Sequence, residues 1–374
     1  MDFRYSEEQD LVRRMARDFA QTEIVPYAAE WDKNYVYPRA TLRSMGTVGL
    51  LMLGIPSEYG GPGLDHVSKN LVTEEIARGD AGIAAAMAAS ALLGSYPVLL
   101  AATPEQKQWW YGMEMEGCMT ALCLRGADVH ADRGMTGISC HRRGDEYIIN
   151  GCHQSVTNGA GAGLYTVFAS LDSRLGARGS CAFMVDRSSR GIGVEATALT
   201  SLPSSGCATV TYNEVRVPAF NLLGKEGDGF ELATRTQNID RVTGAAIAVG
   251  LAQATFETLI QHSLQRYQSG KPIFELPEIH LLLADMAQLI EAGRLSHLMA
   301  AHMLEGGSAD EETVGQTRYL CGDIALKATL DALQIYGGPG WSQEWPVEKY
   351  LRDARMLKCG LEQPRSKKIL SPAI

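Results

Sequence analysis

The chain has 374 residues, of which 45% are hydrophobic, and a formal net charge of −9 at pH 7. This length and apolar content are enough for two or three packed units with a substantial core. The acidic balance argues against a nucleic-acid partner, because phosphate binding needs clustered Lys and Arg. The eight cysteines show no C-x-x-C pairing, so we expect neither a disulfide framework nor a metal site.

The apolar segments predict neither a signal peptide nor a membrane span. The N-terminal stretch is charged and amphipathic, with Phe3, Leu11, Met15 and Phe19 at helical spacing. No run reaches the roughly 18 consecutive apolar residues that a membrane-spanning helix needs. Together with the unpaired cysteines, this pattern favours a protein of the reducing cytoplasm.

Helices are expected from residue 1 to about residue 117. Ser6 precedes three acidic or amide residues and begins a helix whose first-turn acids suit the helix dipole. A loop rich in Gly and Pro (residues 55–66) interrupts the pattern, and a long Ala-rich segment (residues 72–100) follows. Pro104 opens another helix, with Thr103 as its cap.

Near residue 118 the pattern changes to short apolar runs separated by Gly, Ser, Asn and Asp. The predicted strands are residues 119–124, 139–142, 147–149, 164–170, 181–185, 193–196 and 209–215. No helix lies between them, which indicates a small antiparallel β domain rather than a βαβ unit. A dinucleotide-binding GxGxxG motif is absent, so a Rossmann fold is not expected.

Long helices with broad apolar faces return at residues 231–268, 277–304 and 309–336, followed by a short terminal helix. This pattern is typical of a helical bundle. The predicted fold is therefore α+β with three domains. These are an N-terminal helical domain (residues 1–117), a middle antiparallel β domain (residues 118–229) and a C-terminal helical bundle (residues 230–374).

The densest motif is QIYGGPGWSQEWPVEKYLRD, at residues 334–353. An apolar helix stops there on Gly337 and Gly338, and a second helix starts near Pro346. Two adjacent glycines allow another backbone or a flat ligand to approach a helix end closely. By spacing alone, a simple helix–helix corner explains the pattern equally well.

This stretch resembles the C-terminal helical domain of the flavin-dependent acyl-CoA dehydrogenases, whose motif reads Q-x-x-G-G-x-G-[FYW]…E-x-P-[VI]-E-[KR]-x-x-R-D. Five further segments match in the family's order: MDFRYSEEQ, IPSEYGGPGL, GDEYIINGCHQSVTNG, VRVPAFNLLGKEGDGF and QRYQSGKPI. The resemblance implies an FAD cofactor and an acyl thioester substrate carried by CoA or an acyl carrier protein. It also implies a homotetramer or homodimer, with electron-transferring flavoprotein as the default electron acceptor.

The resemblance assigns cofactor-binding residues by position. Thr157 matches a threonine whose hydroxyl lies near the flavin N5–O4 edge, whereas Ser155 stands where the family has a tryptophan. Arg266 matches an arginine that pairs with the FAD pyrophosphate. The residues implied to contact the adenine half of FAD, bound mainly by a neighbouring subunit, are Gln334, Gly337 and Gly338. Without the resemblance, Thr157 would be interpreted as a turn residue and Arg266 as a solvated surface side chain.

Removal of the α-proton of an acyl thioester requires a base over the α-carbon. In most of the family this is a glutamate seven residues after R-D-A, a position that Leu361 occupies here, with Glu362 next to it. A one-residue shift turns a helical side chain by about 100°. Other members use a carboxylate directly before an arginine on the first long C-terminal helix, which corresponds to Asp240 and Arg241. We predict Asp240 as the base, Glu362 as the alternative, and Asn238 and Arg241 as substrate-binding residues.

Several positions near the implied flavin depart from the family pattern. The T-E-P-x-A-G-S-D segment reads CLRGADVH here, at residues 123–130. We therefore expect an atypical dehydrogenase, for example one from a biosynthetic pathway. Two alternatives remain open: a flavin monooxygenase or oxidase on the same fold, and a non-redox acyl-binding protein with a degenerate flavin site.

Overall fold

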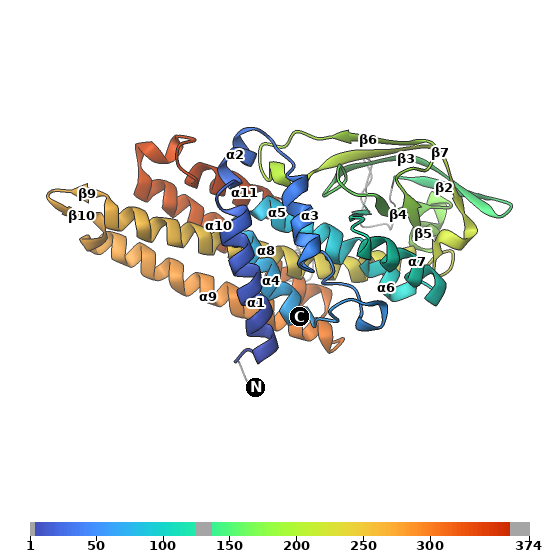
Figure 1. Ribbon diagram of the computed structural model, residues 1–374, viewed down its shortest axis with the longest axis horizontal. Coiled ribbons are helices and arrows are strands. Elements are labelled where there is room, and N and C mark those ends of the chain that lie inside the picture. Colours follow the sequence, from blue (N-terminus) through green and yellow to red (C-terminus); the bar gives the residue numbers. More distant parts are fainter. Residues whose placement is uncertain (1–3, 125–136, 360–374) are drawn as a thin grey trace, which may run out of the picture.

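The computed structural model describes residues 4–124 and 137–359 (Figure 1). The helices of the first and last parts of the chain lie against one another, and the sheet of the middle part forms one end of the molecule. This order of helices, sheet and helices confirms the predicted fold. The helix α7 ends at Met115, the first strand begins at Thr120, and α8 begins at Gly229. The division at 117/118 and 229/230 remains our proposal.

The N-terminal part consists of short and medium helices. They are α1 (Glu7–Phe19), α2 (Ala28–Lys33), α3 (Arg39–Thr47), α4 (His66–Gly79), α5 (Ala81–Ala88), α6 (Tyr96–Ala101) and α7 (Pro104–Met115). Single π-helical turns, η1 (Ala20–Ile24) and η3 (Ala89–Leu93), extend α1 and α5. Ser6 and Thr103 each accept a backbone hydrogen bond in a capping box. The two helix starts predicted at these residues are therefore confirmed.

Eight strands form the sheet in the order β6-β7-β3-β2-β4-β5-β8, with β1 beside β4. They are β1 (Thr120–Cys123), β2 (Ser139–Arg143), β3 (Glu146–Val156), β4 (Leu164–Ser170), β5 (Ser180–Asp186), β6 (Ile192–Ala196), β7 (Ala208–Pro218) and β8 (Leu222–Leu223). Each predicted strand overlaps one of these. Most pairs are antiparallel, but β1 and β2 run parallel to β4. The longer connections between these strands permit parallel pairing, which a tight hairpin does not.

The C-terminal part is a bundle of α8 (Gly229–Gln265), α9 (Pro277–Glu305), α10 (Glu311–Tyr336) and α11 (Val347–Cys359). The central helix α8 packs against α4, α9 and α10. Its predicted end at residue 268 was three residues too late. The chain leaves the helix because Tyr267–Gln268 (β9) pairs with Lys271–Pro272 (β10) in a two-stranded hairpin.

Two stretches of the described chain, Ala81–Ala101 and Gly229–Gln265, are long and apolar enough to cross a membrane. However, 78% and 72% of their most apolar windows are buried inside the protein. We interpret both as core helices, since the core helix of a folded domain has the same length and composition.

Glu114 on α7 is a buried carboxyl group without a cationic partner among the described residues. Its Oε1 accepts a hydrogen bond from Ser95 Oγ, and its Oε2 has no hydrogen-bond partner in the described structure. Burial raises the pKa of Glu114 to about 8, from 4.5 for an ordinary glutamate. The side chain is therefore protonated in the folded protein at neutral pH.

Glu114→Gln is expected to stabilise the fold relative to the wild type at pH 8 but not at pH 4. The contribution of protonated Glu114 is complete below pH 4.5 and is lost as the pH rises toward 8, because only the unfolded chain releases the proton. Glutamine does not ionise, so the difference between the two proteins should grow over this range by a few kcal/mol, on the order of 1.4 per pKa unit. Urea unfolding at pH 4 and pH 8 measures it, and a constant difference would contradict the assignment.

Candidate active site and cofactor site

The turn after β3, residues 155–160, carries two of the predicted cofactor residues, and we call it the Thr157 turn. Ser155 (φ 54°) and Asn158 (φ 60°) have left-handed backbone conformations. The buried Asn158 fixes the turn, because its Nδ2 donates to Thr120 O at 2.9 Å and its Oδ1 accepts from Tyr37 Oη at 2.6 Å. The half-buried Thr157 hydroxyl forms no hydrogen bond with the described residues, so it is available to a ligand.

Ser155 is exposed next to Cys207 on the neighbouring loop. Burial raises the pKa of the Cys207 thiol to about 11, and a hydrogen bond with the Ser155 side chain opposes this shift. The Ser155 hydroxyl thus interacts with the Cys207 thiol, and the serine side chain offers no flat surface to a ligand.

Asp240 lies on α8 with its carboxylate exposed. Arg318 of α10, inside the bundle, interacts electrostatically with Asp240. The Arg318 guanidinium crosses α8 at Gly244, where a Cβ would lie 2.6 Å from its Nε. Its Nη2 donates to Leu357 O at 2.8 Å, while its buried Nη1 has no hydrogen-bond partner among the described residues. Burial lowers the pKa of Arg318, and Asp240 opposes this shift.

The two predicted substrate-binding residues contact each other. Arg241 Nη1 donates to Asn238 Oδ1 at 3.0 Å, and both side chains are half-buried on the same face of α8. Asp240 lies between these two polar residues in the sequence, with the buried Ile239 directly before it. No ion pair within the helix neutralises Asp240 among the described residues, which removes the simplest structural explanation for an aspartate at this position.

The residues predicted to bind the pyrophosphate and the adenine half of FAD lie near the C-terminal end of α8, where His262 stacks on Tyr336. Arg266 is exposed at the C-terminal cap of α8, and Gln334 is exposed on the last turn of α10. Gly337 has φ 64° and ψ −137°, a conformation that only glycine adopts readily. A Cβ at Gly338 would meet no atom within 4 Å. Packing within the chain therefore does not require Gly338 to be glycine.

Within one chain, Asp240 lies far from the residues predicted to bind the pyrophosphate and the adenine half of FAD. Asp240 and Arg266 are 26 residues apart on one helix, which corresponds to about 39 Å at 1.5 Å per residue. Figure 1 shows the β9–β10 hairpin, which follows Arg266 in the chain, at one end of the molecule and the sheet at the other. A ligand that contacts Asp240 therefore reaches Arg266 of the same chain only if it spans this length of α8.

Comparisons with known proteins identify the same family that the sequence motifs resemble. Residues 6–116 match the acyl-CoA dehydrogenase N-terminal domain, and residues 227–360 match the acyl-CoA dehydrogenase C-terminal domain. An acyl-CoA dehydrogenase of Bacillus subtilis (strain 168) is 34% identical over 355 residues, 94% of each chain.

The chain belongs to the acyl-CoA dehydrogenase family.

Solved structures agree with this membership. A structure from work on the electron transferring flavoprotein of Acidaminococcus fermentans has a TM-score of 0.93 and 32% identity, covering 96% of this chain and 95% of that one. An acyl-CoA dehydrogenase from Bacillus anthracis complexed with FAD has a TM-score of 0.86 and 26% identity, covering 95% of this chain and 64% of that one. This protein is therefore an FAD-dependent oxidoreductase of the family that dehydrogenates acyl thioesters.

The described residues of this acyl-CoA dehydrogenase fit FAD. An unpaired threonine hydroxyl at the Thr157 turn, an exposed guanidinium at Arg266 and the open backbone at Gly338 are the donor types that a flavin ring, a pyrophosphate and an adenosine accept. Two positions singled out in the sequence cannot be placed. Glu362 and most of the altered loop, residues 125–130, lie outside the described residues.

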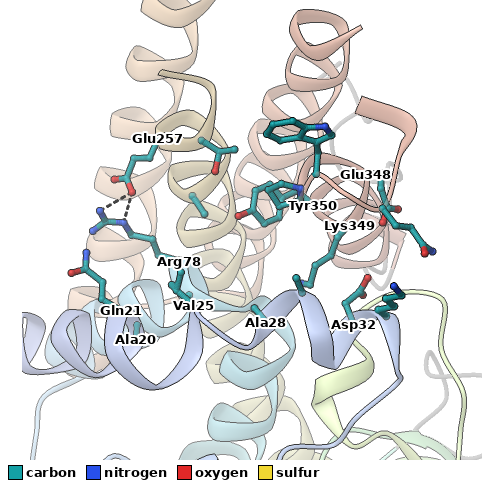
Figure 2. A pocket seen from close by; sticks show the side chains of 18 of the residues that line it. Ala20, Gln21, Val25, Ala28, Asp32, Arg78, Glu257, Glu348, Lys349 and Tyr350 are labelled. Carbon is teal, nitrogen blue, oxygen red and sulfur yellow. Dashed lines mark hydrogen bonds and ion pairs between the residues drawn. The ribbon is translucent and has the colours of Figure 1, made fainter. Parts of the chain in front are cut away.

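A separate cavity of about 580 Å³ lies between the N-terminal helices, α8 and the segment that leads into α11 (Figure 2). Arg78 and Glu257 form an ion pair on one wall at 2.7 Å, and Lys349 and Tyr350 of α11 lie on the other. None of the described residues with a predicted site role lines this cavity. The sequence contains no local signal for it, because its walls come from segments far apart in the chain.

Proposed function

We propose that this protein catalyses the α,β-dehydrogenation of an acyl thioester, with Asp240 as the base. The observation that supports this most strongly concerns α11, which connects Asp240 to the Thr157 turn. Leu357 O binds Arg318 beside Asp240, and one turn earlier Asp353 Oδ1 accepts a hydrogen bond from Leu202 N at 2.8 Å. The loop that begins at Leu202 packs against the Thr157 turn. We infer that α11 relates the position of Asp240 to that of the Thr157 hydroxyl, because it contacts both Arg318 and Leu202.

In the proposed reaction, the Asp240 carboxylate takes the α-proton, and the electrons of that C–H bond form the new C=C bond. FAD, when bound, would supply the acceptor for the hydride that leaves the β-carbon. The Thr157 hydroxyl would hold the ring system, and the Arg266 guanidinium would hold the pyrophosphate. The half-buried Arg241 and Asn238 orient the thioester beside Asp240. The buried, unpaired Arg318 Nη1 keeps a positive potential next to the carboxylate.

The test is anaerobic mixing of the purified holoenzyme with saturated acyl-CoA thioesters of increasing chain length. The proposal predicts bleaching of the flavin absorbance and a product two hydrogens lighter. A protein whose flavin no thioester reduces under nitrogen, but which consumes oxygen once NADH or NADPH is added as the reductant, would instead be a monooxygenase. Acyl-pantetheine on a carrier protein, tested alongside, distinguishes the two carriers.

We also propose a homodimer or homotetramer in which each FAD is completed by a neighbouring chain. The separation of Arg266 from Asp240 supports this, as does an apolar outer face on α10 and α11. Exposed large side chains on that face are Tyr319, Leu320, Leu330 and Met356. Such a face is typical of a subunit interface.

Gly338→Trp is expected to weaken FAD retention and subunit association together, by at least about tenfold in each dissociation constant. The added side chain meets open space within the chain, so the fold itself should survive, while an FAD and subunit contact would be blocked. Light scattering and flavin absorbance after gel filtration measure the two effects. Gly112→Trp on α7, where a Cβ also meets nothing within 4 Å, is the control. A native monomer that retains FAD would contradict the shared site.

We also propose electron-transferring flavoprotein as the electron acceptor, a biosynthetic role and a cytoplasmic location. The cytoplasmic assignment is supported by the seven cysteines outside the last helical turn, which are all free. Reoxidation of the substrate-reduced enzyme by purified electron-transferring flavoprotein, compared with reoxidation by oxygen, tests the acceptor.

A further inference from the structure

Part of the α11 motif, E-K-x-x-R-D, forms a buried charge cluster. Lys349 Nζ lies 2.8 Å from Asp80 Oδ2 and 2.6 Å from Asp353 Oδ2. Ser204 Oγ donates to the remaining Asp80 oxygen, Oδ1. All four side chains are buried. We call Lys349, Asp80, Asp353 and Ser204 the α11 charge cluster.

The cluster joins three parts of the chain. Asp80 caps the N-terminus of α5 by accepting from Ile83 N at 2.8 Å, Lys349 and Asp353 belong to α11, and Ser204 belongs to the β region. Lys349 extends from α11 toward the N-terminal helices (Figure 2). The fit is close, since a Cβ at Gly82 would lie 2.2 Å from Ser204 Oγ. A buried pair of this kind specifies position, because either partner alone would leave an uncompensated charge.

The loop that the cluster holds, residues 200–206, supports the Thr157 turn. Leu202, in a left-handed conformation (φ 51°), donates its N–H to Asp353. Two loop carbonyls then accept from the turn: Ser205 O from Asn158 N at 2.9 Å, and Gly206 O from Ala160 N at 3.0 Å. The path from Lys349 to the backbone on the C-terminal side of Thr157 therefore consists of hydrogen bonds and ion pairs at each step.

A second contact from α11 reinforces the same loop. Arg352 donates through Nη1 to Thr200 O at 2.5 Å and pairs with Asp32 of α2 and Glu348 of its own helix. The loop is thus held at its beginning by Arg352 and in its middle by Asp353 and Asp80. Both sets of contacts come from the helix that also binds Arg318 beside Asp240.

We propose that the α11 charge cluster positions the Thr157 turn against the flavin. The cluster acts through the loop of residues 200–206, which lies between the cluster and the turn. Lys349, Asp353 and Ser204 are positioning residues and touch neither substrate nor cofactor. This inference rests on the proposed assignment of the Thr157 turn to the flavin. It goes beyond that assignment by naming the groups that determine where the turn lies.

The test uses the FAD-loaded holoenzyme and compares Ser204→Ala with a matched control, Ser95→Ala. Both changes remove a buried serine hydroxyl that donates to a buried carboxyl group. Ser204→Ala is expected to shift the flavin reduction potential and absorbance maxima at full FAD occupancy. It should lower kcat by about tenfold to a hundredfold with KM within about twofold, as expected for a misplaced reacting group. Ser95→Ala should leave the potential and the spectrum unchanged.

Asp353→Asn is the second variant, because it keeps an oxygen for the Leu202 N–H while removing the charge. It should shift the potential in the same direction as Ser204→Ala. Thr157→Val separates this inference from the proposed site. If Thr157→Val changes the spectrum while Ser204→Ala and Asp353→Asn match Ser95→Ala, the positioning role is wrong and the flavin site stands. If Thr157→Val changes nothing, the assignment of the turn to the flavin fails, and the positioning role fails with it.

Discussion

Asp240→Asn is expected to slow the reduction of bound FAD by an acyl thioester by about 10²–10⁴-fold, the range that a positioned general base contributes. Asparagine has nearly the same shape but accepts no proton, so the exposed site on α8 keeps its geometry and loses its basicity. FAD affinity should not change, because Asp240 lies 26 residues before Arg266 along α8. Anaerobic stopped-flow absorbance gives the rate, and a flavin titration of the apoprotein gives the affinity.

Glu362→Gln is the matched control, since it removes the other candidate carboxylate in the same way and should change the rate by less than about twofold. The reverse pattern, with Glu362→Gln slow and Asp240→Asn normal, would move the base to the C-terminal segment. If neither variant slows the reduction, no side-chain carboxylate removes the proton. The oxygen-using alternative would then be the better explanation.

Arg266→Ala is expected to raise the FAD dissociation constant by about 10- to 150-fold, which corresponds to roughly 1.5–3 kcal/mol for charge-assisted hydrogen bonds to a phosphate. The Arg266 side chain is exposed and forms no ion pair with the described residues, so its loss costs no contact within the chain. Isothermal titration of the apoprotein with FAD measures the change.

Arg174→Ala serves as its control, because this guanidinium is also exposed but already pairs with Asp172 at 2.8 Å. Its removal should leave the FAD affinity within about twofold of the wild type. An unchanged affinity for Arg266→Ala as well would place that arginine on the solvent face and remove the pyrophosphate contact from the proposed site.

The secondary structure was predictable because its signals are local. The capping residues Ser6 and Thr103 start their helices where the sequence indicates. The short apolar runs separated by Gly, Ser, Asn and Asp predict the strands, and β4 and β5 are buried along nearly their whole length. The end of α8 was predicted less well. Its helical pattern continues into Tyr267 and Gln268, and only the pairing of these residues with β10 shows that the helix has stopped.

The site was predictable only in part. Motif matching gave Thr157, Arg266 and the glycine pair, but not the guanidinium of Arg318 beside Asp240. This electrostatic interaction links residues about 80 positions apart in the chain, and the missing side chain at Gly244 makes room for Arg318. Lys349 and Asp80, which form an ion pair, are even farther apart in the sequence. No periodicity or spacing rule connects such residues, because only the packed fold brings them together.

The most direct test of the account is exchange of the substrate α-proton with solvent. A thioester whose β-carbon is replaced by sulfur has α-protons but no hydride to give, so it isolates proton removal from the redox step. In deuterium oxide, the holoenzyme should incorporate deuterium at the α-carbon, as measured by mass spectrometry. Glu362→Gln should do so at a similar rate, and Asp240→Asn should be slower by at least about a hundredfold. Exchange by Asp240→Asn at the wild-type rate would contradict the assignment of Asp240 as the base.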